Sequence, residues 1–495
     1  MAVKRGIALA LAASAAVAVV IAVGPGSRGG AAARVTRAPT WTDVAPIFAE
    51  KCAGCHRVGG IAPFSLTNAR SAAAHARAIL YMTAHNKMPP WMPGTDSPPF
   101  LGQSQRILTS DEKSLIARWV RGGAHIGKGG TIAPGSSGSS AAGTTLTLTP
   151  AKPYLPKAAV GGIDDYHCFV LEPHVTQDMF VTSAVVQPQQ GSIVHHVILF
   201  EAAGENAKEA RQLNDQSGGN GWTCFGGPGL SETHPGAGTL QDQDRLGAPQ
   251  WISAWVPGHT TNDLPAGTGV LLHAGAAIVM QVHYNLIHPP KHDRSRAVLH
   301  VVPAAGSTLT PLDTVLIPAP VELPCPRGVH SRLCSRGVAV QEEARKYGQT
   351  AALIPAGLLY LCHKSLADYP SAPRNVTSLT TSCDRRVNRP LRIYGVAGHM
   401  HLRGFDIRLD LNPGTPSART LLHIPHWDFH WQDAYYLAQP IDANPGDTIR
   451  VTCAFDNSAK RQPVVHGKRL KPRYVLWGEG TTDEMCLGLL QVADR

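Results

Sequence analysis

The run LRIYGVAGHMHLRGFDIRLDL, residues 391–411, decides the fold class of this chain. Polar and apolar residues alternate along it, which is the period-2 pattern of half-buried strands and not the 3.6-residue period of a helix. Similar runs recur between turn residues: SIVHHVILFEA at 192–202, AAIVMQVHYNL at 276–286, GDTIRVTCAFDN at 446–457 and RYVLWGEG at 473–480. These runs predict β-rich domains from residue 151 to residue 495. Because the stretch is too long for one ordinary β-sandwich, we divide it into domains at 151–305 and 306–495.

The composition excludes several classes of protein. Of 495 residues, 43% are hydrophobic and only 16% are charged, so the low charge is not a sign of disorder. The 49 glycines and 39 prolines favour many turns and few long helices, which excludes a coiled coil. Collagen and a polytopic membrane protein are excluded as well. The net charge of +10 contains no run of Lys or Arg, so nucleic acid is not an expected partner.

The N-terminus has the features of a targeting segment. Lys4 and Arg5 precede an apolar run from Gly6 to Gly24, and small residues follow it. This order is typical of a secretory signal peptide. The run is long enough that an uncleaved membrane anchor is the alternative. We therefore expect residues 1–40 to be a signal peptide or N-terminal anchor with a spacer. The rest of the chain is then exported, to the periplasm or to a membrane surface facing it, where disulfides persist.

Residues 41–126 carry helix signals and 127–150 carry linker signals. The run LTSDEKSLIARWVRGGA, residues 108–124, has Thr109 or Ser110 as N-cap, acidic residues in its first turn and two glycines as its stop. Residues 127–150 are rich in Gly, Ser and Thr, which predicts a flexible linker.

The helical segment contains a haem-attachment motif. Cys52 and Cys55 have the C-x-x-C spacing that lets two thiols bond to the two vinyl groups of one haem, and His56 supplies an axial nitrogen. The candidates for the second axial ligand are Met88, in NKMPPWMPG, and its alternatives Met82 and Met92. Residues 41–126 resemble a small class I cytochrome c, in which the methionine ligand commonly lies in an M-P-P segment, so the resemblance favours Met88. The resemblance implies a small all-α cytochrome c domain with one covalently bound haem c.

Four further motifs in the β-rich part carry metal-binding side chains. His195-His196 lies in a strand-like run, His283 lies in QVHYN, His399-Met-His401 lies in GHMHLRG, and Met485 lies in DEMC. Two histidines at positions i and i+2 of a strand share one face, so both can reach one ion. Two adjacent histidines point to opposite faces, so they can bind one ion only where the strand ends, twists or bulges.

Together and in this order, these residues resemble the copper type II ascorbate-dependent monooxygenase family, whose members are similar to peptidylglycine α-hydroxylating monooxygenase and dopamine β-hydroxylase. The resemblance implies two all-β jelly-roll-like sandwich domains, each with one copper. It implies an electron-transfer copper bound by His195, His196 and His283. It also implies a copper that activates O2 for hydroxylation, bound by His399, His401 and Met485. Imidazole suits both oxidation states of copper, and thioether favours Cu(I).

The cysteines left after the haem motif are eight in number, which allows 105 pairings. The family resemblance selects Cys168–Cys224 and Cys453–Cys486. Proximity in the sequence makes Cys325–Cys334 and Cys362–Cys383 the simplest remaining pairs. A reactive thiol at Cys224 is the alternative.

The chain departs from the peptide-amidating relatives at three positions. Those relatives bind a carboxylate with Arg, Asn and Tyr, whereas Ala397, Leu487 and Leu489 stand here. We therefore expect a small apolar or aromatic substrate. The fused haem segment is a second departure, and we expect it to pass electrons from a periplasmic or membrane donor to the first copper; the reverse direction is the alternative.

Other polar residues are weaker candidates for metal binding or for orienting metal ligands. A third copper at His423, His426 and His430 is conceivable, but these and His167 and His174 are expected to be surface or core histidines. Asp483 and Glu484 could orient ligands or form a solvated acidic pair. The main expectation is a copper- and haem-dependent monooxygenase that uses O2. The alternatives are a multi-centre electron carrier without oxygenase activity and a copper-binding module without turnover.

Overall fold

The computed structural model describes residues 37–58, 62–133, 143–159, 162–230, 250–256, 264–370, 373 and 375–495. Most of the predicted targeting segment and part of the predicted linker lie outside these residues. The chain divides into two units, Met1–Ala38 and Pro39–Arg495, and the description below concerns the second.

Helices occupy the first part of this unit: α1 (Trp41–Lys51), α2 (Ala69–Ala74), α3 (Ala76–Ala84), α4 (Gln103–Arg106) and α5 (Ser110–Arg121). The start of α5 is fixed by Thr109, whose hydroxyl accepts the backbone N–H of Glu112 while the Glu112 carboxylate accepts that of Thr109. The rings of Trp41, Phe48 and Trp119 pack together between α1 and α5.

Two five-stranded sheets form the next part of the unit. The first has the order β1 (Thr144–Leu148), β9 (Arg296–Pro303), β3 (Met179–Gln187), β7 (Thr268–Leu272) and β10 (Thr310–Pro311). The second has the order β5 (Trp222–Thr223), β2 (Asp164–Leu171), β8 (Ala277–Asn285), β4 (Val194–Ala202) and β6 (Trp251–Trp255). Buried side chains of both sheets share one apolar core. Helix α6 (Glu205–Gln216) packs against β4 and β8. Strand β1 lies at the end of the segment for which the composition predicted a linker.

Two four-stranded sheets form the C-terminal part. One has the order β11 (Asp313–Pro318), β22 (Leu487–Asp494), β14 (Leu391–His399) and β17 (Ala434–Ala443). The other has the order β13 (Leu379–Arg386), β18 (Thr448–Phe455), β15 (Gly404–Leu411) and β16 (Arg419–Ile424). The run at 391–411 thus forms the two strands β14 and β15 that its alternation predicts. Short strands form two further pairs: β12 (Glu322–Leu323) with β21 (Val475–Leu476), and β19 (Val464–Val465) with β20 (Lys468–Arg469).

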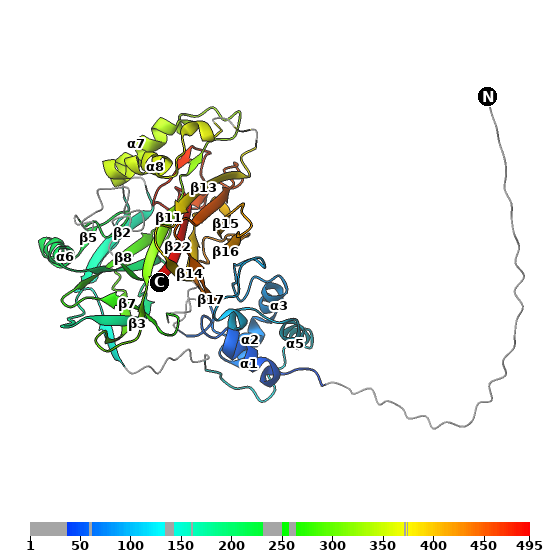
Figure 1. Ribbon diagram of the computed structural model, residues 1–495. Coiled ribbons are helices and arrows are strands. Elements are labelled where there is room, and N and C mark those ends of the chain that lie inside the picture. The colour runs from blue at the N-terminus through cyan, green and yellow to red at the C-terminus, as the bar shows by residue number, and fades with distance from the viewer. Residues whose placement is uncertain are drawn as a thin grey trace, which may run out of the picture. The chain divides into compact units, whose positions relative to one another are not determined.

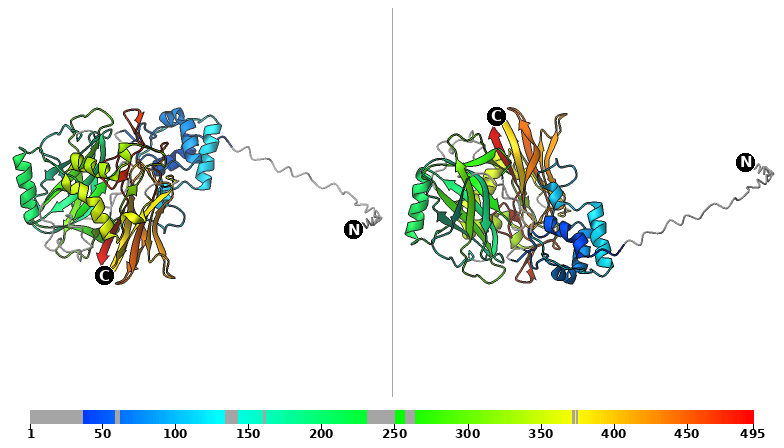
Figure 2. Two further views of the ribbon diagram at one scale, coloured as in Figure 1. Left: turned by 90° about the horizontal axis from the view of Figure 1, so that it is seen from above. Right: turned by 90° about the horizontal axis from the view of Figure 1, so that it is seen from below.

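Two more α-helices and two short 3-10 helices belong to the C-terminal part: η1 (Arg332–Cys334), α7 (Arg336–Tyr347), α8 (Gln349–Leu361) and η2 (Leu366–Asp368). Figure 1 shows α7 and α8 side by side at one end of the sheets. In Figure 2 the blue and cyan helices lie against the orange strands, on the side away from α6.

The expected fold class, a small all-α cytochrome c domain followed by two all-β jelly-roll-like sandwich domains, is wrong. The molecule is mostly β with few helices, and α1–α5 belong to one compact unit with the sheets. The segment before α4 enters the β-rich part: Phe100 lies in the core of the four-stranded sheets, and the Leu101 N–H donates to the Tyr436 carbonyl over 2.8 Å. The β-rich part is not all-β either, because it includes α6, α7 and α8. Helix periods and a haem motif describe local structure and do not reveal this packing between distant segments.

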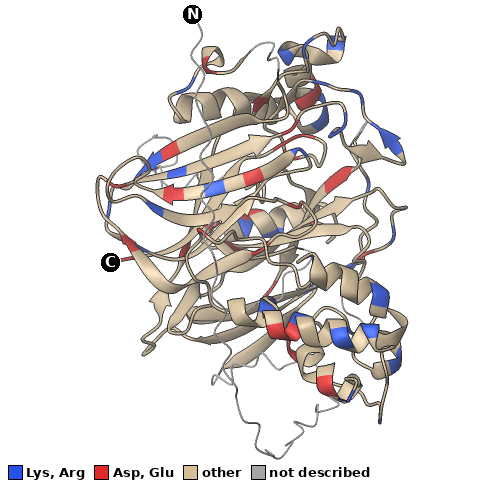
Figure 3. Ribbon diagram, turned by 90° about the vertical axis from the view of Figure 1, so that its right-hand side faces the viewer, with Lys and Arg blue, Asp and Glu red and all other residues tan. Residues whose placement is uncertain are grey.

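The structure contains four disulfides: Cys168–Cys224, Cys325–Cys334, Cys362–Cys383 and Cys453–Cys486. They are the pairs expected from the resemblance and from proximity, and they fit an exported or extracellular protein. Figure 3 shows Lys and Arg interspersed with Asp and Glu over the described chain. Among the described residues, no helix has the length and apolar character needed to cross a membrane.

Candidate metal centres

The adjacent histidines His195 and His196 lie where β4 pairs irregularly with β8. Val194 pairs with Tyr284 and His196 pairs with His283, so His195 is an extra residue in β4. Such a bulge changes the direction of the side chains from the strict alternation of a strand. The local irregularity that two adjacent histidines need to bind one ion is therefore present in β4.

The three histidines of β4 and β8 form a compact cluster. The Nδ1 atom of His196 lies 3.3 Å from Nδ1 of His195 and 3.3 Å from Nδ1 of His283. One donor atom from each residue lies within 4.8 Å of the others. Two imidazole nitrogens that bind one ion tetrahedrally at about 2.0 Å are about 3.3 Å apart. The spacing therefore fits one ion held through the Nδ1 atoms.

A buried carboxylate contacts the ring nitrogen of His283 that faces away from the other two histidines. The Nε2 atom of His283 lies 2.9 Å from Oδ1 of Asp164, on β2. Asp164 also accepts the Thr481 hydroxyl over 2.6 Å and the Thr481 backbone N–H over 3.0 Å. A carboxylate on the second nitrogen of a histidine fixes the ring and its tautomer, which leaves Nδ1 for a metal. The sequence does not predict a role for Asp164, because no local pattern places this residue opposite His283.

His399 and His401 form a second cluster at the end of β14. Their ring centroids lie 5.1 Å apart with nearly perpendicular planes, at 86°. His399 Nδ1 donates to Gln432 Oε1 over 2.6 Å, which leaves Nε2 as its donor atom for a metal. His401 Nδ1 is buried and has no hydrogen-bond partner among the described residues. An unpaired buried nitrogen is costly, and a bound ion would satisfy it.

Glu484 joins Met485 to this second cluster. Its carboxylate accepts the backbone N–H of Met485 over 3.0 Å and that of Arg403 over 2.8 Å, and it also accepts the N–H of His401. Glu484 is fully buried and Asp483 is 3% exposed. The alternative of a solvated acidic pair is therefore wrong, because both side chains are removed from water.

The two clusters are neighbours. The ring centroids of His196 and His399 are 6.4 Å apart, with the planes at 81°. Phe429 stacks on His195 at 4.4 Å and contacts His401 edge-on at 5.7 Å. Phe429 therefore packs between one histidine of each cluster, a role that the sequence did not indicate.

Burial keeps these imidazoles neutral. It lowers the pKa of His195, His196 and His401 well below the usual value for histidine. It also lowers the pKa of His399 to about 4, against the opposing effect of the hydrogen bond to Gln432. Neutral imidazole is the form that binds metal ions.

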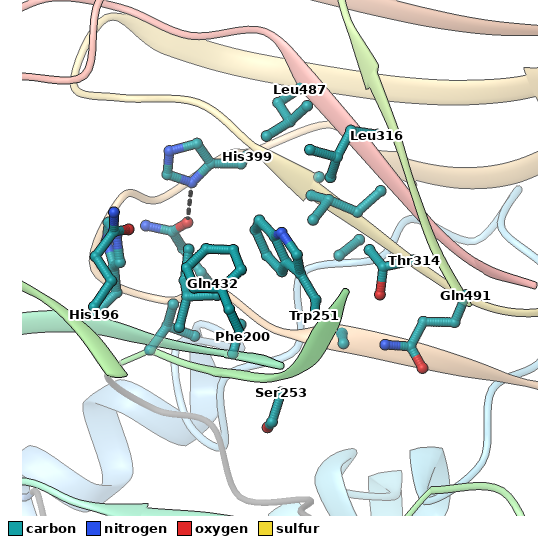
Figure 4. Close-up of a pocket in the computed structure, with 18 of the residues that line it drawn as sticks. His196, Phe200, Trp251, Ser253, Thr314, Leu316, His399, Gln432, Leu487 and Gln491 are labelled. Carbon is teal, nitrogen blue, oxygen red and sulfur yellow. Dashed lines mark hydrogen bonds between the residues drawn. The ribbon is translucent and has the colours of Figure 1, made fainter. Parts of the chain in front are cut away.

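A cavity of about 440 Å³ opens beside both clusters, and His196, His399 and Met485 line it. Figure 4 shows Phe200 and Trp251 on one side of it and Leu316 and Leu487 on the other. The three apolar residues that replace carboxylate-binding residues in the peptide-amidating relatives, Ala397, Leu487 and Leu489, are all part of the lining.

The haem motif lies just after α1. Cys52 and Cys55 are free of disulfides. His56 Nδ1 donates to the Phe64 carbonyl over 3.0 Å, which leaves Nε2 as the nitrogen for an axial bond. Attachment of a haem at these residues stays a prediction. Met88 follows α3 and is half-buried, and its role stays a prediction.

Three of the other candidate residues, His423, His167 and Cys224, have partners of their own. His423 lies 2.8 Å from Asp96 and 3.0 Å from Asp406, and these contacts raise its pKa against the effect of burial. His167 Nε2 donates to the Asn220 carbonyl over 2.7 Å. Cys224 is in a disulfide, so it is not a reactive thiol.

Comparison with known proteins gives one informative match. No curated protein matches the chain. Solved structures that align with it include PBCV-1 VP54 fitted into a reconstruction of the virophage Sputnik, with 8% identity, 72% of this chain and 95% of that chain covered, and a TM-score of 0.22. They also include the 11S globulin from Wrightia tinctoria, with 11% identity, coverage of 73% and 87%, and a TM-score of 0.11. The oxalate decarboxylase from Bacillus subtilis at pH 4.6 has 8% identity, coverage of 73% and 79%, and a TM-score of 0.13.

These scores are too low to carry an argument about the fold. In contrast, residues 355–491 match the family model described as "Copper type II ascorbate-dependent monooxygenase, C-terminal domain", which supports a copper-dependent monooxygenase.

Proposed function

We propose that this chain is an exported haem- and copper-dependent monooxygenase that hydroxylates a C–H bond of an apolar organic substrate with O2. The observation that carries the proposal is the shared cavity: residues of both histidine clusters and Met485 line one apolar space. The family match at 355–491 supports the copper chemistry. A pure electron carrier has no need of an enclosed apolar cavity beside its metal sites.

The overall reaction balances with an external reductant. O2 takes up two electrons and two protons, one oxygen atom enters the C–H bond, and the other leaves as water. Copper bound at the two clusters would supply the one-electron chemistry that O2 activation requires.

The residues of the chain hold the geometry for this reaction. Asp164 fixes the ring of His283, and Gln432 fixes that of His399. Glu484 holds the backbone of His401 and Met485 together. The apolar walls of the cavity would exclude water from a bound substrate, which strengthens electrostatic interactions within it.

The haem motif is the proposed entry point for electrons. Cys52 and Cys55 would bind haem c covalently, His56 and Met88 would be its axial ligands, and a periplasmic or membrane donor would reduce it. The two thiols outside the disulfides and the hydrogen bond from His56 to Phe64 support this assignment. The N-terminal segment and the four disulfides support export, to the periplasm or to a membrane-anchored position facing it.

The substitution Met485→Ile tests the proposal. It removes the thioether but keeps an apolar side chain of similar size, so we expect substrate-dependent O2 uptake to fall at least about 100-fold while the protein stays folded. Met179→Ile is the matched control, because Met179 is a buried methionine in the core of the five-stranded sheets. Incorporation of label from 18O2 into product by the parent, and its loss in Met485→Ile alone, would support hydroxylation. Equal turnover by both variants, or two bound copper ions with no O2 uptake by the parent, would contradict it.

A further inference from the structure

The cavity has a polar end remote from the histidines, which the proposed reaction leaves without a role. The cavity lining follows β22 from Leu487, which pairs with His399, to Gln491, which pairs with Thr314 of β11. Figure 4 shows Thr314 and Gln491 on the side of the cavity opposite His399, with Trp251 between. Four residues of strand measure about 13 Å, so a ligand that reaches both ends is elongated.

The side-chain carbonyl oxygen of Gln491, Oε1, is buried without a hydrogen-bond donor among the described residues. Positions 487, 489 and 491 share one face of β22, and the other two are leucines. An unpaired buried carbonyl is costly, so a glutamine that ends an apolar row is best explained by a ligand that donates to it.

A hydroxyl group on the ligand suits this end of the cavity. It can donate to Gln491 Oε1 and at the same time accept from the hydroxyl of Thr314, its cross-strand neighbour. If the amide were turned over, the same hydroxyl could accept from the Gln491 nitrogen instead. The polar end therefore selects a group that both donates and accepts.

Charged groups suit it less well. The described residues that line the cavity include no Lys and no Arg, so a carboxylate would be buried without a counter-charge. Of the two acidic residues of the lining, Asp433 and Glu479, the first is already paired with Arg106. An ammonium group beside Thr314 and Gln491 would meet only neutral partners.

We infer that the substrate is an elongated, uncharged apolar alcohol, with its hydroxyl bound by Gln491 and Thr314 and the C–H bond to be oxidised at the His399 and Met485 end. This inference rests on the proposed function for the reaction, but the binding preference it predicts can be measured without turnover.

The test is equilibrium binding to the full-length protein, with and without copper, followed by tryptophan fluorescence and by calorimetry. The probe is 6-phenylhexan-1-ol, whose length is close to the span of the cavity. Its methyl ether, 6-phenylhexanoate and 6-phenylhexylamine are the comparison ligands. We expect the alcohol to bind about tenfold more tightly than the ether, which lacks the donor, and more tightly than either charged ligand.

Gln491→Leu should remove the preference for the alcohol over the ether while ether binding persists. Gln187→Leu, on β3 and outside the cavity, is the matched control and should keep the preference. Thr314→Val provides a second variant if Gln491→Leu does not fold, and should reduce the same ratio. Equal binding of alcohol and ether, tighter binding of the acid or amine, or an unchanged ratio in both cavity variants would overturn the inference. The alcohol preference without any copper-dependent oxygenation would overturn the proposed function and leave only the inferred binding of an alcohol at Gln491 and Thr314.

Discussion

Single residues that hydrogen-bond to the candidate metal ligands provide the sharpest test of the candidate centres. Asp164 holds the ring of His283 from the side opposite the cluster. Asp164→Asn removes the charge and places an amide where two oxygens now accept from Thr481 and His283. We expect copper affinity at the first cluster to fall about 10–100-fold, the usual effect of losing such a partner. Competition with a chelator of known affinity measures this change.

Asp165→Asn is the control for that substitution. Asp165 is the next residue of β2, is also buried, and accepts from Tyr154 and the Lys157 backbone instead of from His283. It should leave copper affinity close to that of the parent. If both variants lost the same affinity, the effect would come from damage to β2 and not from the contact with His283.

The grouping of the candidate histidines could be predicted from the sequence, but the residues that hydrogen-bond to them could not. The motifs around His195, His399 and Met485 are local patterns, and the structure brings the histidines of each predicted set close together. Asp164 lies 119 residues from His283, and Gln432 lies 33 residues from His399. Such contacts arise only from tertiary packing, and neither residue has a local pattern that marks it.

At the scale of elements, the alternating runs of polar and apolar residues predicted strands, but they gave no sign of the helices between those runs. The alternating run at 391–411 forms β14 and β15. The alternating runs do not predict α7 and α8, because these helices lie in the segment before residue 391, outside the runs. The α7 helix also buries a titratable side chain, since Glu343 is only 4% exposed.

Glu343 on α7 predicts a pH dependence of stability. Burial, and then the nearby Asp483, raise its pKa to about 9, against the opposing effects of Lys346 and Arg473. The folded state thus favours the neutral acid, so its contribution is fully present below about pH 4.3, the usual pKa of glutamate, and is lost as the pH rises towards 9. Glu343→Gln stays neutral. Its free energy of unfolding relative to the parent should therefore increase by at least about 1.4 kcal/mol between pH 5 and pH 8.5.

Urea unfolding at pH 5, 7 and 8.5 measures that difference. Glu342→Gln is the neighbouring control: Glu342 is half-buried and lies 3.6 Å from Arg473, so its substitution should show no such rise with pH. A constant difference between Glu343→Gln and the parent across the three pH values would show that Glu343 ionises normally.

At the scale of the whole molecule, one ion pair connects the helical segment that contains the predicted haem motif to the second histidine cluster. Arg106 on α4 pairs with Asp433, and its guanidinium also donates to the Pro90 carbonyl over 3.3 Å. Asp433 follows Gln432, which holds His399. From the sequence we expect electrons to enter at the copper bound by His195, whereas the contact between Arg106 and Asp433 lies beside His399.

The ion pair predicts a joint effect on stability and electron transfer. Arg106→Gln removes the ion-pair partner of the Asp433 carboxylate, whose side chain is 2% exposed, and loss of one partner of such a pair should destabilise the protein by about 3–5 kcal/mol. If the proposed haem is present, reoxidation of the reduced haem by added Cu(II) should slow at least about tenfold in this variant, because the contact between the two regions is weakened. Thermal unfolding and stopped-flow absorbance of the haem measure the two effects.

The double variant Arg106→Gln with Asp433→Asn separates charge from contact. It removes the charge of Asp433 together with that of Arg106, so most of the lost stability should return, because a neutral pair avoids the cost of a buried carboxylate that has lost its counter-charge. Arg121→Gln, at the exposed end of α5, should change neither quantity and serves as the control. If reoxidation recovered together with stability in the double variant, the charge pair would serve folding alone. If it stayed slow while stability returned, the guanidinium of Arg106 itself would be needed for rapid electron transfer between the two regions.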